Sequence, residues 1–369
     1  MRAVIVLSLL FPVLLGGIGK SGTGNHRIDE IPLTMKSETG QNIPFNMSDM
    51  IESVRYIRVE DTRILGKIGD VKYIGGLFYI LDKGNQSIVV VDETGTIRST
   101  IAHHGRASYE YLSIWAFDVD SGRGEVHVFD QKGLKIIVYS REGKYLRSVP
   151  LDPLYAAFED MALSGRGTYL LCKETDGKEK GLVELDASGK LVRRLISISV
   201  KYRYGVVHNP VCLNRLSDGS VTWMGGTDKN LFYRVFPDGK CVPSYHLSLD
   251  VKLPASLQKK TYADPDDMAG QNYYTIFTYN ETDHWLLLVA FSQNRAKICY
   301  YDKRSKKVHV VTGGADVIDP NGTGLLNYWR GCGNSLIAFL ENPDMPAYQR
   351  AVREVGEGNN PIIVVATLK

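Results

Sequence analysis

The sequence has little surplus of charge of either sign. Its 44 basic side chains stand against 41 acidic ones, and without Arg2 and Lys20 near the N-terminus the balance is 42 against 41, or +1. A domain this close to neutral lacks the positive field that draws proteins to nucleic acid, so no nucleic-acid partner is expected. A hydrophobic content of 44% and an aromatic content of 10% exclude a disordered or collagen-like chain and a polytopic membrane protein.

Long hydrophobic runs are scarce. The one extended run, Ala3 to Leu15, follows Arg2 and ends in small residues, which is typical of a secretory signal peptide over residues 1–19. A membrane anchor is the alternative, but the run is shorter than the ~20 residues that span a bilayer, and Pro12 interrupts it. No cysteine stands near it that could carry a lipid. We therefore expect a cleaved leader, no membrane span in the mature protein, and a periplasmic or secreted location.

Residue patterns that carry chemistry are absent as well. The five cysteines include no C-x-x-C pair, and an odd number cannot pair completely within one chain. Cys172 and Cys299 stand in apolar runs, which favours small buried residues in strands over a redox or metal role. The sequence contains no G-x-S-x-G, H-E-x-x-H or P-loop motif. We therefore nominate no catalytic residue, no metal ligand and no cofactor.

What the sequence does contain is an internal repeat. Residues 77–101 and 125–149 align without a gap, each with an apolar run, an Asp, a glycine-containing turn, a second run, another turn with glycine and a third run. A third copy covers residues 168–196, and weaker copies begin near 220, 284 and 334. Short β-type runs that recur at this spacing are typical of propeller blades.

The repeat predicts the fold. Each unit has three strand-like runs and a fourth in the stretch before it, and four short antiparallel strands make one blade. A single blade cannot bury both of its faces, so six blades must pack in a closed ring. We therefore expect an all-β, six-bladed β-propeller over residues 50–369, after an irregular lead-in over residues 20–49.

Both ends of the propeller segment are expected to be structural. Met50 to Asp61 alternates well enough for a strand, and Pro361 to Leu368 is an unbroken apolar run. Together they should close the ring within the last blade. Pro346 to Val355 is the one convincing helix, because proline stands at its start and glycine follows its end.

The repeated turn residues have structural explanations. Glycine follows the second run in four units, where a tight hairpin requires a positive φ. These glycines are Gly95, Gly143, Gly189 and Gly239. Asp82 and Asp130 end a strand just before a turn, where a carboxylate accepts main-chain N–H bonds. Turn capping is favoured over catalysis for both.

The segment FYILDKGNQSIVVVDETG within residues 77–101 resembles the NHL repeat, with its strand, Asp, small turn and second strand leading to Asp-x-x-Gly. Nearly all of the mature chain is similar to a six-bladed β-propeller family common in gut Bacteroidetes. The similarity includes R-V-E-D-T in the first strand, a Gly105-Arg106 loop followed by Glu110-Tyr111, and a closing strand that ends in Leu-Lys. In this loop Ala107, Ser108 and Tyr109 replace the Gly-Pro-Gly of the family. The resemblance implies an exported protein.

The densest polar cluster of the sequence lies in this loop, between the first two repeat units. Its candidate ligand-binding residues are His103, His104, Arg106, Tyr109, Glu110 and Tyr111. We expect the loop at the mouth of the central channel, where its charges and aromatic rings would hold a ligand. The alternative is an ordered linker in which Arg106 pairs with Glu110 and the tyrosines pack between blades. Adjacent histidines in an extended segment point to opposite sides, so they share no metal.

These observations favour an exported, non-catalytic binding or scaffold propeller for a glycan, peptide or protein partner, expected to be a monomer. The alternative is a propeller enzyme of the lyase, glycosidase or lactonase type, with its active site at the central channel. Titratable residues from different blades that converge in one pocket would distinguish the enzyme from the binding protein.

Overall fold

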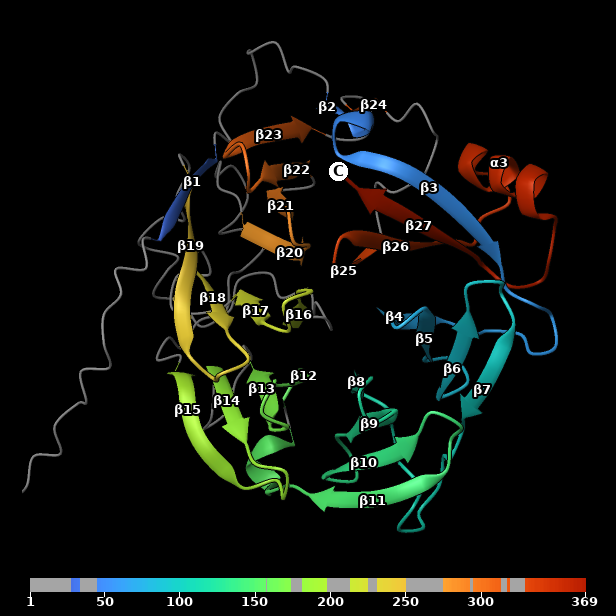
Figure 1. The fold of residues 1–369 in the computed structure, drawn as a ribbon, viewed down its shortest axis with the longest axis vertical. Coiled ribbons are helices and arrows are strands. Elements are labelled where there is room, and N and C mark those ends of the chain that lie inside the picture. Colours follow the sequence, from blue (N-terminus) through green and yellow to red (C-terminus); the bar gives the residue numbers. More distant parts are fainter. Residues whose placement is uncertain are drawn as a thin grey trace, which may run out of the picture.

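The computed structural model of the protein describes residues 28–33, 45–156, 158–173, 181–197, 213–224, 231–249, 275–292, 295–312, 317–318 and 329–369. The predicted signal peptide, residues 1–19, lies outside these ranges. The described residues form six four-stranded antiparallel blades around a central axis, with one blade extended by a fifth strand (Figure 1). The six-bladed propeller is confirmed.

Strands are arranged in each blade from the channel outward to the rim. Blade 1 consists of β4 (Ile68–Ile74), β5 (Leu77–Asp82), β6 (Ser87–Asp92) and β7 (Ile97–Ile101). Blade 2 consists of β8 (Ala116–Asp120), β9 (Glu125–Asp130), β10 (Lys135–Ser140) and β11 (Tyr145–Pro150). Blade 3 consists of β12 (Asp160–Leu163), β13 (Tyr169–Lys173), β14 (Gly181–Leu185) and β15 (Leu191–Ser197).

The second half of the ring follows the same order until it closes. Blade 4 consists of β16 (Leu213–Arg215), β17 (Val221–Met224), β18 (Leu231–Val235) and β19 (Cys241–Leu249). Blade 5 consists of β20 (Thr275–Glu281), β21 (Trp285–Ser292), β22 (Arg295–Asp302) and β23 (Lys307–Thr312). Blade 6 consists of β25 (Trp329–Cys332), β26 (Ser335–Leu340), β27 (Ile362–Leu368) and β3 (Ile51–Arg58).

Blade 6 closes the ring with strands from distant parts of the chain, as predicted. β27 pairs antiparallel with β3, with Val364 opposite Tyr56. The innermost strands β4, β8, β12, β16, β20 and β25 each contact the next one around the ring, and β25 contacts β4. Because β3 and the last strand, β27, share one sheet, the ring closes through main-chain hydrogen bonds as well as through side-chain packing.

The core is divided among the blade interfaces. The described residues form six hydrophobic clusters, each shared by two neighbouring blades. Tyr79 and Phe117 pack between blades 1 and 2, and Trp223 packs between blades 3 and 4. Each buried large side chain contributes roughly 1.5–3 kcal/mol, so the ring is stabilised at all of its interfaces. Cys172 and Cys299 are buried in strands β13 and β22, as predicted.

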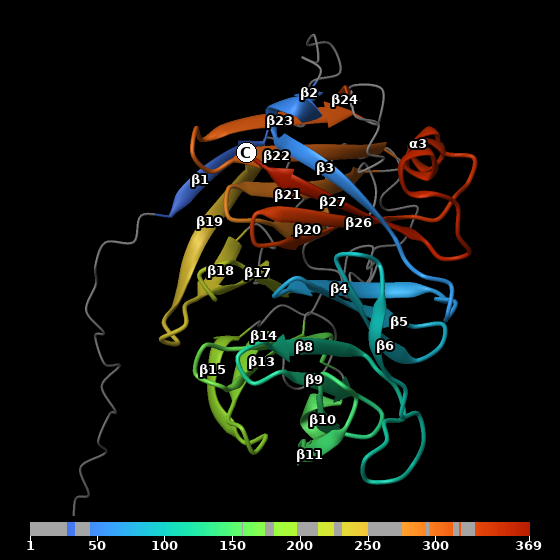
Figure 2. The ribbon, with the colours of Figure 1, turned by 45° about the vertical axis from the view of Figure 1, so that its right-hand side comes forward.

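The irregular lead-in expected over residues 20–49 needs correction. β1 (Asp29–Leu33) pairs in parallel with β19 and becomes the fifth strand of blade 4, on its outer edge (Figure 2). Ile31 and Leu33 are buried between blades 4 and 5. β2 (Phe45–Asn46) pairs with β24 (Val317–Ile318) and leads into a 3₁₀ turn over Met47–Asp49. These pairings join segments far apart in sequence, so local periodicity does not reveal them.

The predicted turn glycines are confirmed and have a second role. Gly95, Gly143, Gly189 and Gly239 have φ of +88°, +88°, +83° and +85°. In addition, each turn lies against the preceding blade or its outermost strand. A Cβ added to Gly95 would lie 1.9 Å from the carbonyl oxygen of Arg58, and the Gly95 carbonyl accepts a 2.9 Å bond from Glu60 N. The absence of a side chain therefore permits close contact between blades.

The predicted capping by Asp82 and Asp130 is also confirmed. Asp130 accepts bonds from Gly133 N at 2.9 Å within its own turn, and from Leu112 N at 2.9 Å and Ser113 N at 3.1 Å in the segment that enters β8. Asp82 likewise accepts from Asn85 N and from Gly66 N, at 3.0 Å each. Each carboxylate thus fixes a turn and the entry to its blade together.

Among the described residues, helix occurs only in short segments outside the blades. The predicted helix is confirmed as α3 (Pro346–Val355), which packs Ala347, Tyr348 and Ala351 on the cluster between blades 5 and 6 and ends at Gly356. A 3₁₀ turn over Pro153–Tyr155 lies between blades 2 and 3. Among the described residues, no helix has the length and apolar character required to cross a bilayer.

Candidate functional site

The loop singled out by its sequence lies at the outer rim rather than at the channel mouth (Figure 1). It leads from β7, the outermost strand of blade 1, and packs on β10 and β11, the two outer strands of blade 2. Ser108 O accepts a 3.1 Å bond from Ser148 Oγ, and Tyr109 O accepts a 2.6 Å bond from Tyr139 Oη. The expected position of the loop is therefore corrected, because its contacts hold it over the outer strands.

Two of the six candidate residues are committed to packing. Tyr111 is buried between blades 1 and 2, and its hydroxyl donates to Gln86 O at 2.6 Å. The His103 ring stacks on Tyr139 with centroids 5.1 Å apart, and its Nε2 lies 2.8 Å from Gly143 O. Burial raises the pKa of Tyr111 to about 12, which keeps its hydroxyl protonated.

The remaining four candidates do not form one constellation. His104, Arg106 and Tyr109 are exposed. Glu110 accepts a 2.8 Å bond from Ala107 N. The ion pairs of the described residues do not include one between Glu110 and Arg106. Tyr109 instead meets Tyr145 of β11 edge to face, with ring centroids 6.4 Å apart.

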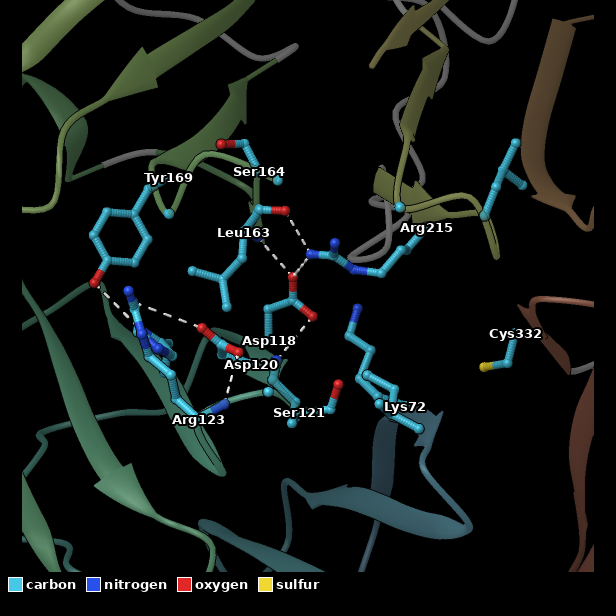
Figure 3. Close-up of a pocket in the computed structure, with 18 of the residues that line it drawn as sticks. Lys72, Asp118, Asp120, Ser121, Arg123, Leu163, Ser164, Tyr169, Arg215 and Cys332 are labelled. Atoms are coloured by element: carbon cyan, nitrogen blue, oxygen red, sulfur yellow. Dashed lines mark hydrogen bonds and ion pairs between the residues drawn. The ribbon is translucent and has the colours of Figure 1, made fainter. Parts of the chain in front are cut away.

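A cavity of about 790 Å³ opens where the inner strands end, and not where the 103–111 loop leads into the start of β8 (Figure 3). The loop enters β8 at its first residue, whereas the cavity is formed by the last residues of β8 and by the turn that follows. Four other blades contribute the corresponding positions. The lining segments are residues 72–74, 118–123, 163–167, 215–217 and 330–333.

A repeated tetrapeptide forms two sides of the cavity. Ser-Gly-Arg-Gly occurs at residues 121–124 and again at 164–167, in the turns after β8 and β12. Arg123 is 66% exposed at its side chain and lies 3.7 Å from Asp120, so its guanidinium is largely unoccupied. Arg166 instead pairs with the buried Glu184. This repeat is visible in the sequence and was not recognised there as a signal for the site.

We call the part of the cavity lined by Lys72, Asp118, Arg215 and Arg330 its floor. The floor contains an ion pair between blades that are not neighbours. Asp118 in blade 2 pairs with Arg215 in blade 4 (Figure 3). Asp118 also accepts bonds from Leu163 N at 2.7 Å and from Val119 N at 2.9 Å. Burial alone would raise the pKa of Asp118, but Arg215, Lys72 and the Leu163 N–H outweigh burial, and the pKa is lowered.

Two further cations reach the floor from blades 1 and 6. Lys72 Nζ lies 3.2 Å from Asp70, and Arg330 Nε lies 3.5 Å from the same carboxylate. Arg330 Nη2 donates to Leu213 O at 2.7 Å. Asp160 accepts bonds from the N–H groups of Met161 and Leu213. Burial raises the pKa of Asp160 despite the nearby charges of Lys72 and Arg330.

The wall between blades 2 and 3 carries the titratable residues closest to a catalytic arrangement. His127 Nδ1 lies 3.1 Å from Tyr169 Oη, and His127 Nε2 lies 3.3 Å from Glu125. Arg147 holds Glu125 through two 2.7 Å bonds. Burial lowers the pKa of His127 and raises the pKa of Tyr169 to about 12, so Tyr169 is a hydrogen-bond donor and not an activated nucleophile.

The lining contains more cationic than anionic side chains, although carboxylates outside it pair with four of the cations. Six cationic side chains contribute to it, against two carboxylates. The cations are Lys72, Arg123, Arg147, Arg166, Arg215 and Arg330, and the carboxylates are Asp118 and Asp120. Within the described residues, no group of three or more His, Cys, Asp or Glu side chains is placed to hold a metal ion. The arrangement thus offers multiple donors to oxygen atoms of a ligand.

Comparison with known proteins identifies a family for nearly the whole described chain. The model of the family described as Domain of unknown function (DUF4934) matches residues 29–367. No curated protein matches the chain.

Solved structures share the fold. The chain is similar to a candidate exported protein from Bacteroides fragilis, with a TM-score of 0.71, 16% identity and coverage of 92% of this chain and 99% of the other. It is also similar to a member of the DUF4221 family from Bacteroides vulgatus, with a TM-score of 0.50, 10% identity and coverage of 86% and 97%. At such identities the likeness concerns the fold alone.

Proposed function

The chain belongs to the family described as Domain of unknown function (DUF4934), and we propose that it is an exported, non-catalytic propeller that binds an acidic glycan in the channel cavity. The excess of cationic side chains in the cavity carries this proposal. Export is supported by the leader pattern of residues 1–19.

The size and surface of the cavity support a sugar ligand. A volume of about 790 Å³ falls within the roughly 300–1,000 Å³ of small-ligand sites. Ser121, Ser164 and Ser217 line the cavity from three turns, together with Gly122, Gly165 and Gly167. Hydroxyl, amide and guanidinium groups suit a ligand with many oxygen atoms, such as a uronic acid or a sulfated sugar.

The geometry supports binding more than catalysis. A lyase, glycosidase or lactonase needs a group that readily accepts or donates a proton near neutral pH. The raised pKa of Tyr169, and the engagement of Glu125 by Arg147, favour a fixed hydrogen-bonding wall. Incubation of the purified protein with acidic oligosaccharides and lactones, analysed for products, tests this: turnover that His127→Gln abolishes would favour the enzyme instead.

The rim loop is a second candidate site, for one specific reason. Tyr109 in this loop is 46% exposed and Tyr145 of β11 is 37% exposed, and their rings meet edge to face. Exposed aromatic rings are suitable surfaces for a sugar or a protein partner. We propose this surface as the alternative binding position on the same propeller.

A glycan array with acidic and neutral members, followed by calorimetry on the hits, tests the proposed function. Arg123→Ala should weaken binding of an acidic hit about tenfold, as expected for the loss of a charged hydrogen bond. Arg304→Ala is the matched control, because Arg304 is also exposed and also lies 3.7 Å from its carboxylate, Asp302, but is not part of the cavity.

The same assay separates the two positions. Arg106→Ala and Tyr109→Ala should leave binding of an acidic hit unchanged. If these two variants lose binding while Arg123→Ala retains it, the ligand occupies the rim loop. An array on which acidic glycans bind no better than neutral ones would refute the anionic ligand.

A further inference from the structure

Three cations meet at the floor of the cavity with donors that the protein does not use. Lys72 extends from β4 in blade 1, Arg215 from β16 in blade 4 and Arg330 from β25 in blade 6. Figure 3 shows the Lys72 side chain pointing toward the Asp118–Arg215 pair. Asp70 contacts both Lys72 and Arg330, and Asp118, the partner of Arg215, interacts electrostatically with Lys72, so the three cations belong to one cluster.

The unused donors are specific atoms. Arg330 is 5% exposed, and its buried Nη1 has no hydrogen-bond partner in the described structure, although Nη2 donates to Leu213 O. Arg215 Nε is buried and likewise without a partner there. The contact of Lys72 Nζ with Asp70, at 3.2 Å, occupies only part of an ammonium that has three N–H donors. A buried guanidinium N–H without an acceptor is costly, so an acceptor from outside the chain would be favourable here.

The neighbouring carboxylates Asp118 and Asp160 accept main-chain N–H bonds on both of their oxygen atoms. Asp118 receives Val119 N on one oxygen, and Leu163 N and Arg215 on the other. Asp160 receives Met161 N on one oxygen and Leu213 N on the other. In the described structure, neither carboxylate accepts a hydrogen bond from Arg330 Nη1 or Arg215 Nε.

We propose that the floor is an oxyanion site, in which Lys72, Arg215 and Arg330 bind a carboxylate or sulfate group. Donors that come from three blades can reach different oxygen atoms of one anion. That this anion is part of the ligand filling the cavity rests on the proposed function. The binding of a small oxyanion at the floor does not.

Inorganic sulfate is the probe for the floor. Calorimetry at constant ionic strength should detect one sulfate site in the wild-type protein, and Lys72→Met should weaken it by about tenfold or more. Lys303→Met is the matched control, because the Lys303 side chain is about as little exposed as that of Lys72 (10% against 9%) and also pairs with a carboxylate, Glu281, but it lies in blade 5 and does not line the cavity. Equal sulfate affinity in the wild type and the folded Lys72→Met variant would overturn the proposal.

A measurement on the wild type alone covers the case in which Lys72→Met does not fold. Crystals soaked in selenate, which replaces sulfate and scatters anomalously, should show a selenium peak among Lys72, Arg215 and Arg330. Crystals without a peak there would also overturn the floor site.

Acetate and sulfate, added separately, distinguish a carboxylate site from a sulfate site.

The two proposals also fail in different ways. Sulfate bound at the floor without any acidic glycan in the cavity would leave the floor site and refute the proposed function. An acidic glycan bound equally by the wild type and Lys72→Met would refute the floor site alone.

Discussion

The carboxylate of Asp118 in blade 2 pairs with the guanidinium of Arg215 in blade 4, although blade 3 stands between them. Blade 3 takes part in the same contact. Leu163 N donates to Asp118 at 2.7 Å, and Arg215 Nη2 donates to Leu163 O. One buried carboxylate and one guanidinium thus connect the inner strands of three blades at the floor of the cavity.

Asp118→Asn should lower the free energy of unfolding by about 3 kcal/mol, because it leaves Arg215 as an uncompensated charge. Urea denaturation at pH 7 measures this. Asp120→Asn provides the control, since Asp120 is more exposed and its contact with Arg123 is long, at 3.7 Å; a change within about 0.5 kcal/mol is expected. Equal effects of the two substitutions would contradict the structural role of the Asp118–Arg215 pair.

Gly95→Ala should destabilise the closure between blades 6 and 1 by about 3 kcal/mol or more. The new Cβ would meet the carbonyl oxygen of Arg58 at 1.9 Å, and φ of +88° disfavours any side chain. Gly75→Ala separates the two causes, because Gly75 has φ of +60° but no atom within 4 Å of an added Cβ. Gly75→Ala should therefore lower the free energy of unfolding by only about 1–2 kcal/mol. Thermal and urea unfolding of both variants make the comparison, and similar losses would rule out the inter-blade contact as the cause.

Asp130→Ala should lower the free energy of unfolding by about 3 kcal/mol, because three main-chain N–H groups lose their acceptor together. Asp238→Ala is a suitable control. Asp238 is an exposed turn residue that accepts a bond from Lys240 N, so its loss should cost about 1 kcal/mol or less. Chemical denaturation gives both values, and an Asp130→Ala variant as stable as Asp238→Ala would show that the blade entry does not depend on the cap.

His127 should make the stability of the protein pH-dependent below neutrality. Burial lowers the pKa of His127 in the folded protein below its ordinary value of 6.5, so the unfolded chain takes up a proton that the folded one does not. Stability is therefore present at pH 7 and falls as the pH drops below about 6.5. The carboxylate pKa of Asp92, at about 2, lies well outside this window.

His127→Gln should reduce that slope, because glutamine keeps hydrogen-bonding groups beside Tyr169 but does not titrate. Melting temperatures of both proteins between pH 7 and pH 5 provide the measurement. A slope that is the same in the variant would show that His127 is not the group responsible.

Much of the fold follows from short-range patterns in the sequence. The glycines at 95, 143, 189 and 239 and the aspartates at 82 and 130 mark turns whose requirements are local, and the turns form as predicted. β1 was missed because its partner, β19, lies far along the chain and pairs with it in parallel. Pro32 also stands within β1, and a proline inside a short run argues against a strand.

The site was the harder prediction. The 103–111 loop is chemically dense, yet it leaves the outermost strand of one blade and is held over the outer strands of the next. The Ser-Gly-Arg-Gly repeat at 121–124 and 164–167 was the available signal, because it puts the same turn at the same end of two neighbouring blades.

The blades follow from local patterns, because alternation within a strand and glycine in a hairpin depend on residues a few positions apart. Which side chains face the channel depends instead on how the blades pack around the ring. Lys72, Arg215 and Arg330 are unremarkable in their own strands, and no motif joins them. They converge because the closed ring brings the ends of six inner strands around one axis, and that geometry depends on the packing of every blade interface.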